Sequence, residues 1–262
     1  MQCKEIMNII EQAYPKEAAL EFDNVGLQSG RSGREVRKIY LALDATEEVV
    51  QSAIAFEADM LITHHPLIFS PLKSVTDEDF VSRRILELIQ KDISYYAMHT
   101  NYDVLGMAGL AERILGLKDA QVLDVTEERN GREEGIGRIG SLEKEMTLRE
   151  CCGYVRRCLK LDSVKVFGNL EKGVQRLAVS PGSGKSAIAP ALQKGADVLV
   201  TGDIGHHDGL DAWEQGLAVV DAGHYGTEYI FMEDMKAFLE KRLEGVEIKT
   251  APAANPFCVM QA

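Results

Sequence analysis

The six histidines of this 262-residue chain fall in four short clusters, and they are the residues best suited to chemistry. Each cluster also contains acidic or turn-forming neighbours. Imidazole and carboxylate groups bind borderline and hard divalent ions in proteins. The clustering therefore predicts a metal site. The clusters are His64 with His65, His99, His206 with His207, and His224.

The spacing within two of these clusters suits metal ligands. His64 and His65 directly follow the apolar run 59–63. Adjacent residues of an extended chain point to opposite sides, so this pair suits two different ions, or one ion and one supporting contact. His224 and Glu228 are four residues apart at the start of an expected helix, which places them on one face. A carboxylate at that position can bridge two ions.

A third segment alternates polar side chains. His99, Asn101 and Asp103 are expected to share one face of an extended segment, because side chains two residues apart in such a segment point the same way. Asp103 also precedes the helix expected over residues 104–115, where an N-terminal cap is the alternative role. The two roles are compatible, since a carboxylate has two oxygens.

Other side chains are candidates for supporting or catalytic roles. Asp44 and Asp203 end expected strands and suit a hydrogen bond that orients a ligating imidazole, with a solvated turn as the alternative. Thr63 and Asn101 are assigned to the same supporting group. Three histidines are catalytic candidates, as proton shuttles or substrate contacts, although packing at a helix start is the alternative for the adjacent pair. These candidates are His99, His206 and His207.

The elements expected to position these residues alternate between strands and helices, as in βαβ units. Residues 60–62 and 198–200 are continuously apolar, which is typical of strands buried on both faces. In the first half, strands are expected at 38–43, 59–63 and 93–97, and helices at 46–57, 80–90 and 104–115.

The chain also repeats itself at a constant offset of 138 residues: 38–42 and 58–63 match 176–180 and 196–201. We therefore expect an α/β protein of two related halves, with mixed, largely parallel sheets flanked by helices and the metal site between the halves. The first domain is predicted to comprise residues 1–124 plus 222–262 and to carry most metal ligands. The second comprises residues 125–221, entered through the charged stretch 127–134.

Composition limits the partners. The net charge of −12 argues against nucleic-acid binding, which needs clustered Lys and Arg. The sequence contains no run of about 20 apolar residues of the kind that spans a membrane. The five cysteines form no C-x-x-C pair and suggest reduced thiols. A cytoplasmic protein without nucleic-acid or membrane partners is expected.

Residues 180–186 end in Gly-Lys-Ser, like a phosphate-binding Walker loop. However, Val179 stands where the first glycine of that motif belongs. A simple turn and helix cap is the favoured interpretation, and phosphate binding by the backbone of the Gly182-Ser183-Gly184 loop is the alternative.

Six motifs together resemble one known family, the toroidal dinuclear-metal-centre proteins, which are type 2 homologues of GTP cyclohydrolase 1. The resemblance covers nearly the whole chain. The motifs are FDNVGLQ at 22–28, LDAT at 43–46, THHPL at 63–67, HTNYD at 99–103, TGDIGHHD at 201–208 and GHYGTE at 223–228.

This resemblance implies a two-domain α/β fold, a homohexameric ring and two divalent ions per chain. Two departures stand out. Residues 105–109 read LGMAG, where many members have PGGVN, and the chain is too short for the inserted domain of longer members. The residues that match the family's metal ligands are His64, His65, Asp103, His224 and Glu228, with the glutamate as bridge.

The leading functional hypothesis is a dinuclear-metal-dependent hydrolase of a small nucleotide-like or phosphorylated substrate, similar to GTP cyclohydrolase type 2. Two ions can share a hydroxide and polarise a carbonyl or phosphoryl oxygen. Zinc, iron or manganese would suit these ligands. The alternative is a non-catalytic scaffold that binds or delivers metal as a hexameric ring. The physiological substrate and the metal are left open by the residues.

Overall fold

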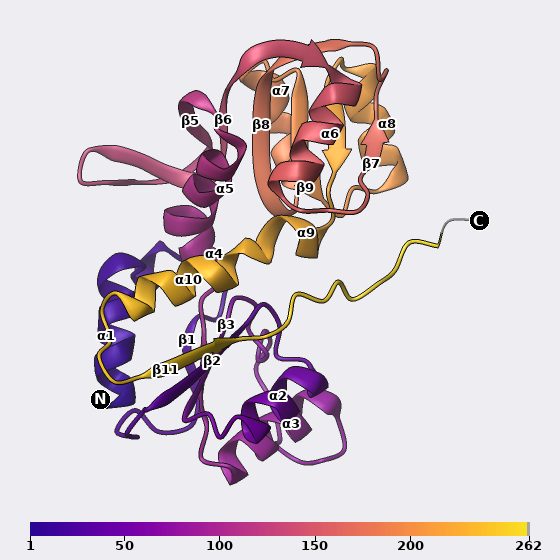
Figure 1. Cartoon of the computed structure of the whole chain (residues 1–262). Coiled ribbons are helices and arrows are strands. Elements are labelled where there is room, and N and C mark those ends of the chain that lie inside the picture. Colours follow the sequence, from indigo (N-terminus) through magenta and orange to yellow (C-terminus); the bar gives the residue numbers. More distant parts are fainter. Residues whose placement is uncertain (261–262) are drawn as a thin grey trace. The chain divides into compact units, whose positions relative to one another are not determined.

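The computed structural model describes residues 1–260, which form two compact units (Figure 1). Unit 1 comprises residues 1–102 and 231–253, and unit 2 comprises residues 103–230 and the described residues from Ala254 onward. Each unit contains one sheet and its own helices. The chain therefore passes between the units at the bonds Tyr102–Asp103 and Ile230–Phe231, and again after Ala253.

The sheet of unit 1 has five strands, and four of them run parallel. The edge strand β1 pairs antiparallel with β4. Every residue of β3 and β4 is buried, as expected for central strands covered on both faces. The strand order is β1 (Gly26–Ser29), β4 (Ser94–Ala97), β3 (Met60–Thr63), β2 (Lys38–Ala42) and β11 (Glu247–Thr250).

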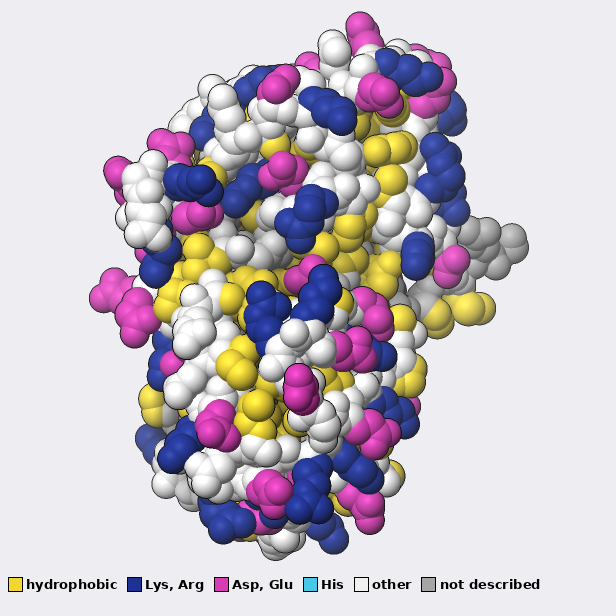
Figure 2. Space-filling model, turned by 60° about the vertical axis from the view of Figure 1, so that its left-hand side comes forward, with side chains coloured by type: hydrophobic (Ala, Val, Ile, Leu, Met, Phe, Trp, Pro, Cys, Tyr) yellow, Lys and Arg dark blue, Asp and Glu magenta, His cyan; other side chains and the backbone are white. Residues whose placement is uncertain are grey.

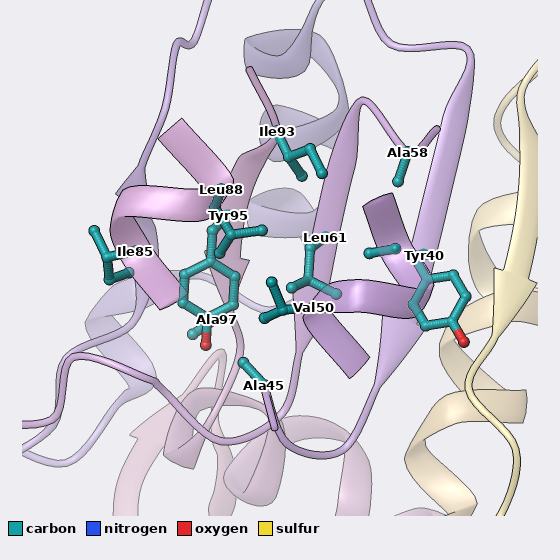
Figure 3. Packing of buried hydrophobic residues seen from close by; sticks show 11 residues of the cluster. Tyr40, Ala45, Val50, Ala58, Leu61, Ile85, Leu88, Ile93, Tyr95 and Ala97 are labelled. Atoms are coloured by element: carbon teal, nitrogen blue, oxygen red, sulfur yellow. The ribbon is translucent and has the colours of Figure 1, made fainter. Parts of the chain in front are cut away.

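Helices α2 (Glu47–Ala55) and α3 (Phe80–Gln90) pack on one face of this sheet. Figure 3 shows Leu61 and Tyr95 of the sheet among side chains from the two helices. A fully buried Leu such as Leu61 contributes about 1.5–3 kcal/mol to folding. Both helices begin at a side-chain cap: the Thr46 hydroxyl accepts from Val49 N, and the Asp79 carboxylate from two backbone N–H groups.

The opposite face of the sheet is covered by helices from both ends of the chain. Tyr96 of β4 donates a hydrogen bond of 3.1 Å to Glu11 of α1 (Cys3–Ala13). The ring of Tyr14 then packs on Phe238 of α10 (Ile230–Glu240), with centroids 5.4 Å apart. The short elements η1 (Lys16–Ala18) and α4 (Thr100–Tyr102) complete the unit.

The sheet of unit 2 has six strands, with a parallel centre and antiparallel flanks. Its three central strands β8, β9 and β10 are parallel, and β5, β6 and β7 pair antiparallel with their neighbours. The order is β5 (Lys118–Arg129), β6 (Arg132–Thr147), β8 (Gly173–Ser183), β9 (Val198–Gly202), β10 (Ala218–Asp221) and β7 (Lys165–Phe167). The predicted α/β class with mixed, largely parallel sheets is confirmed.

Seven helical segments belong to unit 2 in the described part of the chain. The first, η2, is a wide π-helical turn that continues directly into α5. The segments are η2 (Asp103–Met107), α5 (Ala108–Leu115), α6 (Leu148–Cys158), η3 (Lys185–Ala187), α7 (Ile188–Gln193), α8 (His206–Glu214) and α9 (His224–Glu228).

The boundaries of the units differ from those expected at 124/125 and 221/222. The first expected boundary falls inside β5, whose residues pair with β6 along its length. The second would separate α9 from β8 and β9, yet α9 packs against both strands. Hairpin pairing and helix–strand packing therefore keep residues 103–124 and 222–230 in unit 2.

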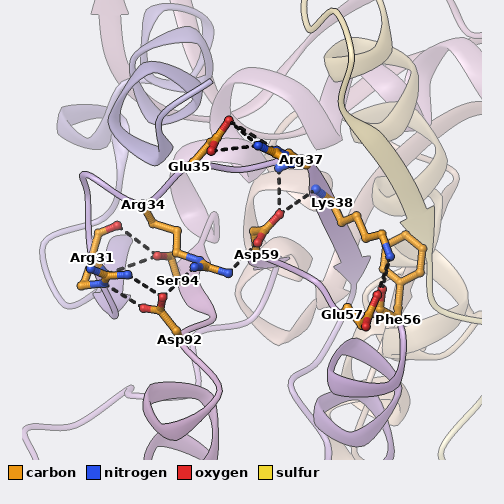
Figure 4. Close-up of polar contacts among 10 residues, drawn as sticks. All are labelled: Arg31, Arg34, Glu35, Arg37, Lys38, Phe56, Glu57, Asp59, Asp92 and Ser94. Carbon is orange, nitrogen blue, oxygen red and sulfur yellow. Dashed lines mark hydrogen bonds and ion pairs between the residues drawn. The ribbon is translucent and has the colours of Figure 1, made fainter.

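The internal repeat is present in the hydrogen bonding as well as in the sequence. Ile39 pairs with Met60 in unit 1, and Leu177 pairs with Val198 in unit 2, which is the same register displaced by 138 residues. In Figure 4, the side chain of Asp59 accepts a hydrogen bond of 2.8 Å from the backbone N of Arg37. The prediction of two related halves is therefore confirmed by the strand register.

The surface carries both signs of charge. On the face shown in Figure 2, Lys and Arg side chains alternate with Asp and Glu side chains. Among the helices of residues 1–260, none combines the length and the apolar composition needed to cross a membrane.

Candidate metal centre

Unit 1 gathers three histidines where its parallel strands end. His64 and His65 directly follow β3, and His99 comes two residues after β4. Parallel neighbouring strands bring their carboxyl ends to one edge, so these side chains meet. The ring centroids lie 4.9 Å apart for His64 and His65, and 5.4 and 5.5 Å from His99. One nitrogen of each ring lies within 4.8 Å of the others, close enough to share an ion.

Each of these imidazoles is held through its Nδ1 atom. His64 Nδ1 is 2.7 Å from the Met98 carbonyl oxygen, and His65 Nδ1 is 2.8 Å from Asp44 Oδ1. His99 Nδ1 is 2.9 Å from Asp23 Oδ1. A carbonyl only accepts hydrogen bonds, so His64 must carry its proton on Nδ1, and Nε2 is then the atom that could bind a metal ion.

Asp23 contacts the histidine cluster, and the sequence did not predict it as a site residue. Burial raises the pKa of its carboxyl group, but hydrogen bonds from His99 and Thr100 outweigh this effect and lower the pKa to about 2. Thr100 donates to Asp23 Oδ2 from its backbone N at 2.9 Å and from its hydroxyl at 2.6 Å. The only sequence signal was the position of Asp23 in the FDNVGLQ motif.

Two residues assigned to a supporting role contact the backbone. The Thr63 hydroxyl donates to the carbonyl oxygen of His65 at 2.7 Å and lies 2.8 Å from the Tyr95 hydroxyl. Asn101 donates to the Tyr14 carbonyl oxygen at 2.9 Å. These contacts stabilise the path of the chain around the histidines.

Unit 2 presents a second cluster on helix α9. His224 and Glu228 are one turn apart, and His224 Nε2 lies 3.0 Å from Glu228 Oε2. His224 Nδ1 is 2.7 Å from Asp203 Oδ2. The predicted pair on one helix face therefore meets directly. The hydrogen bond with Glu228 is the largest influence on His224, and with the contribution of Asp203 it raises the pKa to about 9 in spite of burial.

Glycines allow the strands of unit 2 to approach α9 this closely. A Cβ atom on Gly182 would lie 2.2 Å from Glu228 Oε1, and one on Gly202 would lie 2.4 Å from His224 N. Gly182 also has φ of +76° and donates from its N–H to the Thr227 hydroxyl at 2.9 Å. Gly182 and Ser183 are the last residues of β8 and pack against α9, so the structure has a strand end here, where a simple turn and helix cap was expected.

The conformation expected around Asp103 is wrong. Residues 100–102 are helical, and Asp103 begins the π-helical turn, so no extended segment aligns His99, Asn101 and Asp103. The Asp23 carboxylate accepts from Thr100 N and starts the helix there, before the position at which Asp103 would act as a cap. Asp103 is half-buried within this turn, a type often found at functional sites.

His206 and His207 lie at the start of α8 and are exposed. Their rings are 5.1 Å apart and contact each other edge to face. Neither belongs to any group of close ligand atoms among residues 1–260. The structure therefore does not bring these two catalytic candidates to a histidine cluster within their unit.

The donor atoms in each unit suit a divalent ion. Unit 1 offers three imidazole nitrogens, and unit 2 offers one imidazole with the carboxylates of Glu228 and Asp103. Nitrogen and carboxylate oxygen without thiolate are ligands for zinc, iron or manganese. The residues present thus fit the predicted cofactor class.

Comparison with known proteins gives consistent matches along the chain. The sequence profile of the family described as Duf34/NIF3 (NGG1p interacting factor 3) matches residues 1–256. A Clostridium perfringens protein named GTP cyclohydrolase 1 type 2 homolog is 35% identical over 261 residues, covering 98% of this chain and 99% of its own length.

Solved structures agree with this match. A Bacillus cereus protein related to NIF3 superimposes with a TM-score of 0.92 at 28% identity, over 99% of both chains. Reduced HcgD from Methanocaldococcus jannaschii superimposes with a TM-score of 0.82 at 32% identity, over 95% of this chain and 97% of HcgD.

Proposed function

Since this chain belongs to the Duf34/NIF3 family, we propose that it is a dinuclear-metal-dependent hydrolase of a small nucleotide-like or phosphorylated substrate. Relatives that carry the name GTP cyclohydrolase 1 type 2 homolog support the nucleotide-like substrate class.

The observation that carries the proposal is the common orientation of four imidazoles. In each, Nδ1 is hydrogen-bonded to a carboxylate or carbonyl oxygen, at 2.7–2.9 Å. Such an acceptor fixes the ring and directs Nε2 to the opposite side, where His64, His65 and His224 would bind an ion and His99 would exchange a proton. Histidines that served only packing would not need a hydrogen-bond acceptor at the Nδ1 atom of every ring. The four rings are His64, His65, His99 and His224.

We propose that five side chains would hold two ions. Glu228 would supply a carboxylate to the ions, since it is buried and lies 3.0 Å from His224. Asp103 is the first residue of unit 2, and Glu228 lies two residues before Ile230, the last residue before the chain returns to unit 1. Both carboxylates therefore adjoin points where the chain passes between the units. The full set is His64, His65, Asp103, His224 and Glu228.

Bound ions would lower the pKa of a coordinated water to roughly 7 and polarise a carbonyl or phosphoryl oxygen of the substrate. The residues around them have separate tasks. Asp44 and Asp203 orient the imidazoles of His65 and His224. The ring of His99 is held by Asp23, which places its Nε2 atom to donate a proton to a leaving atom or to accept a proton.

The first experiment is metal analysis of protein purified without added metal. We expect two ions per chain in the wild type and fewer in His64→Ala and in Asp103→Ala. His206→Ala is the matched control, because it removes an imidazole that lies outside the clusters, and it should retain both ions. Hydrolysis of nucleotides and phosphoesters is then screened with the loaded protein.

The outcomes separate the two functional hypotheses. Hydrolysis that disappears in His64→Ala but persists in His206→Ala would support the enzyme. Two bound ions without any hydrolysis would favour the metal-binding or metal-delivery scaffold. A wild-type chain that binds no zinc, iron or manganese would overturn both.

The proposal includes a homohexameric ring, which the family resemblance implies. Sedimentation analysis of the purified chain measures its mass directly. Six copies per particle are expected, and a monomer at micromolar concentration would contradict the ring.

A further inference from the structure

Two exposed aromatic rings stand beside the histidines of unit 1. Phe22 is 63% exposed and Phe69 is 52% exposed, and their ring centroids lie 6.2 Å apart at an angle of 50°. The ring of Phe69 also lies 6.4 Å from that of His99, edge to face. We call Phe22 and Phe69 the aromatic pair. Its rings are open to solvent on one side and reach the candidate metal centre on the other.

Hydrogen bonds fix the backbone that carries this pair. Asn24 donates from Nδ2 to the Ile68 carbonyl oxygen at 2.6 Å, and Ile68 N donates to Gln28 Oε1 at 2.9 Å. Leu67 N donates to the Tyr95 hydroxyl at 2.8 Å. The two loops are therefore tied to each other and to the sheet. The rings are exposed on a fixed support, which is the arrangement of a preformed binding surface.

A cavity of about 390 Å³ adjoins the pair and shares Phe69 as a wall. It lies between the loop after β3 and the start of α3, and Lys73, Ser74 and Ser82 are among its lining residues. Its volume falls in the range of small-molecule sites. The ammonium group of Lys73 and the hydroxyl group of Ser74 suit an anionic substituent, while the Asp79 carboxylate, also in the lining, accepts from the backbone at the start of α3.

We propose that the aromatic pair binds the planar heteroaromatic base of a nucleotide, and that the adjoining cavity receives its phosphate beside Lys73. The base stacks on one phenyl ring and is met edgewise by the other, since the two rings are tilted. This inference rests on the proposed function, because it identifies the substrate class of the same site. It places the base next to His99 and the phosphate farther along the loop after β3.

The test is calorimetric titration of zinc-loaded protein with three probes: guanosine, ribose 5-phosphate and guanosine 5′-monophosphate. The double variant Phe22→Leu/Phe69→Leu should bind guanosine and the monophosphate roughly 5- to 100-fold more weakly, as loss of base stacking predicts. Its affinity for ribose 5-phosphate should not change. Lys73→Ala should weaken both phosphate-bearing probes and leave guanosine binding unchanged.

Phe80→Leu is the matched control, because Phe80 is 58% exposed and is not among the cavity-lining residues. It should bind all three probes like the wild type. Equal binding of guanosine by the wild type and the double variant would overturn the assignment. The assignment would also be overturned if the wild type bound no guanosine or if the double variant lost zinc. A change in the oligomeric mass of the double variant would overturn it too, and would assign the pair to a subunit interface.

Failure of this inference is distinguishable from failure of the proposed function. If the wild type holds two ions but binds no guanosine, the role of the aromatic pair in base binding is refuted, whereas the proposed metal-dependent hydrolase is not. A wild type without ions would overturn the proposed function. Guanosine titration of that metal-free protein would still test the aromatic pair.

Discussion

Asp203 holds His224 by a hydrogen bond of 2.7 Å to Nδ1, and it does so from a left-handed backbone with φ of 57°. Asp and Asn adopt this conformation more readily than most other residues. The carboxylate turns His224 Nε2 toward Glu228, 3.0 Å away. A locally strained residue thus orients the imidazole that the candidate metal centre uses.

Replacing Asp203 should weaken metal binding without disturbing the backbone. Asp203→Asn keeps the left-handed conformation accessible but removes the negative charge at His224 Nδ1. Zinc affinity, measured by competition with a chelator, should fall roughly 10- to 100-fold. Asp208→Asn is the control, because Asp208 pairs with Lys185 at 3.0 Å, and wild-type affinity is expected. Equal affinity in both variants would refute the orienting role.

The stability of the metal-free chain should fall at high pH. His224 has a pKa of about 9 in the folded chain, raised above the ordinary value of 6.5. A raised pKa stabilises the fold fully below pH 6.5, and the contribution disappears as pH rises through 9. Urea unfolding between pH 6 and 10 measures this loss. In Glu228→Gln, which lacks the main cause of the raised pKa, the decline over this window should be smaller.

Zinc binding should release a proton at neutral pH. The proton on His224 must leave before Nε2 can bind an ion, so affinity should rise roughly tenfold per pH unit below pH 9. Calorimetry in two buffers of different ionisation enthalpy counts the released protons. If His224→Ala releases as many protons as the wild type, the released proton comes from another group.

A methyl group at Gly182 should disrupt the cluster on α9. The added Cβ would lie 2.2 Å from Glu228 Oε1, in addition to the strain of a φ of +76°. Gly195→Ala is a matched control, since Gly195 has a φ of +70° and nothing within 4 Å of an added Cβ. The backbone strain of a positive φ, which both alanine variants share, should lower the free energy of unfolding by about 1–2 kcal/mol. Gly182→Ala should lose more stability than this in urea unfolding, and it should also lose zinc.

The two halves should respond alike to loss of a repeated carboxylate. Asp59 Oδ2 accepts from the backbone N of Arg37 and Lys38, and Asp197 Oδ2 accepts from that of Gln175 and Arg176, all at 2.8–3.1 Å. Asp59→Ala and Asp197→Ala should each lower the free energy of unfolding by about 1–3 kcal/mol.

Chemical denaturation of each variant measures this change. Glu57→Ala serves as the control, because it removes only an exposed ion pair with Lys38 and should change stability by less than about 1 kcal/mol. If Asp59→Ala lowered the free energy of unfolding and Asp197→Ala did not, the two repeated carboxylates would not be energetically equivalent.

Much of this protein was predictable from local sequence. Continuous apolar runs predicted the buried strands β3 and β9, and the offset of 138 residues predicted their common register. Motifs carried the family resemblance, which the match over residues 1–256 confirms. The histidines were informative because few side chains bind such ions and all six fall in four clusters.

Contacts between distant segments were decided only by the tertiary structure. His64 meets the carbonyl oxygen of Met98 because the parallel strands β3 and β4 end at the same edge. His99 meets Asp23, 76 residues away, because the antiparallel strand β1 begins where β4 ends. His206 resembled the other histidines in sequence but lies exposed on α8. Residue type and spacing determined which groups can bind an ion. Asp44 and Asp203 were expected to orient imidazoles, but which ring each one meets, and the acceptors of His64 and His99, depend on strand order and helix packing, which no local pattern records.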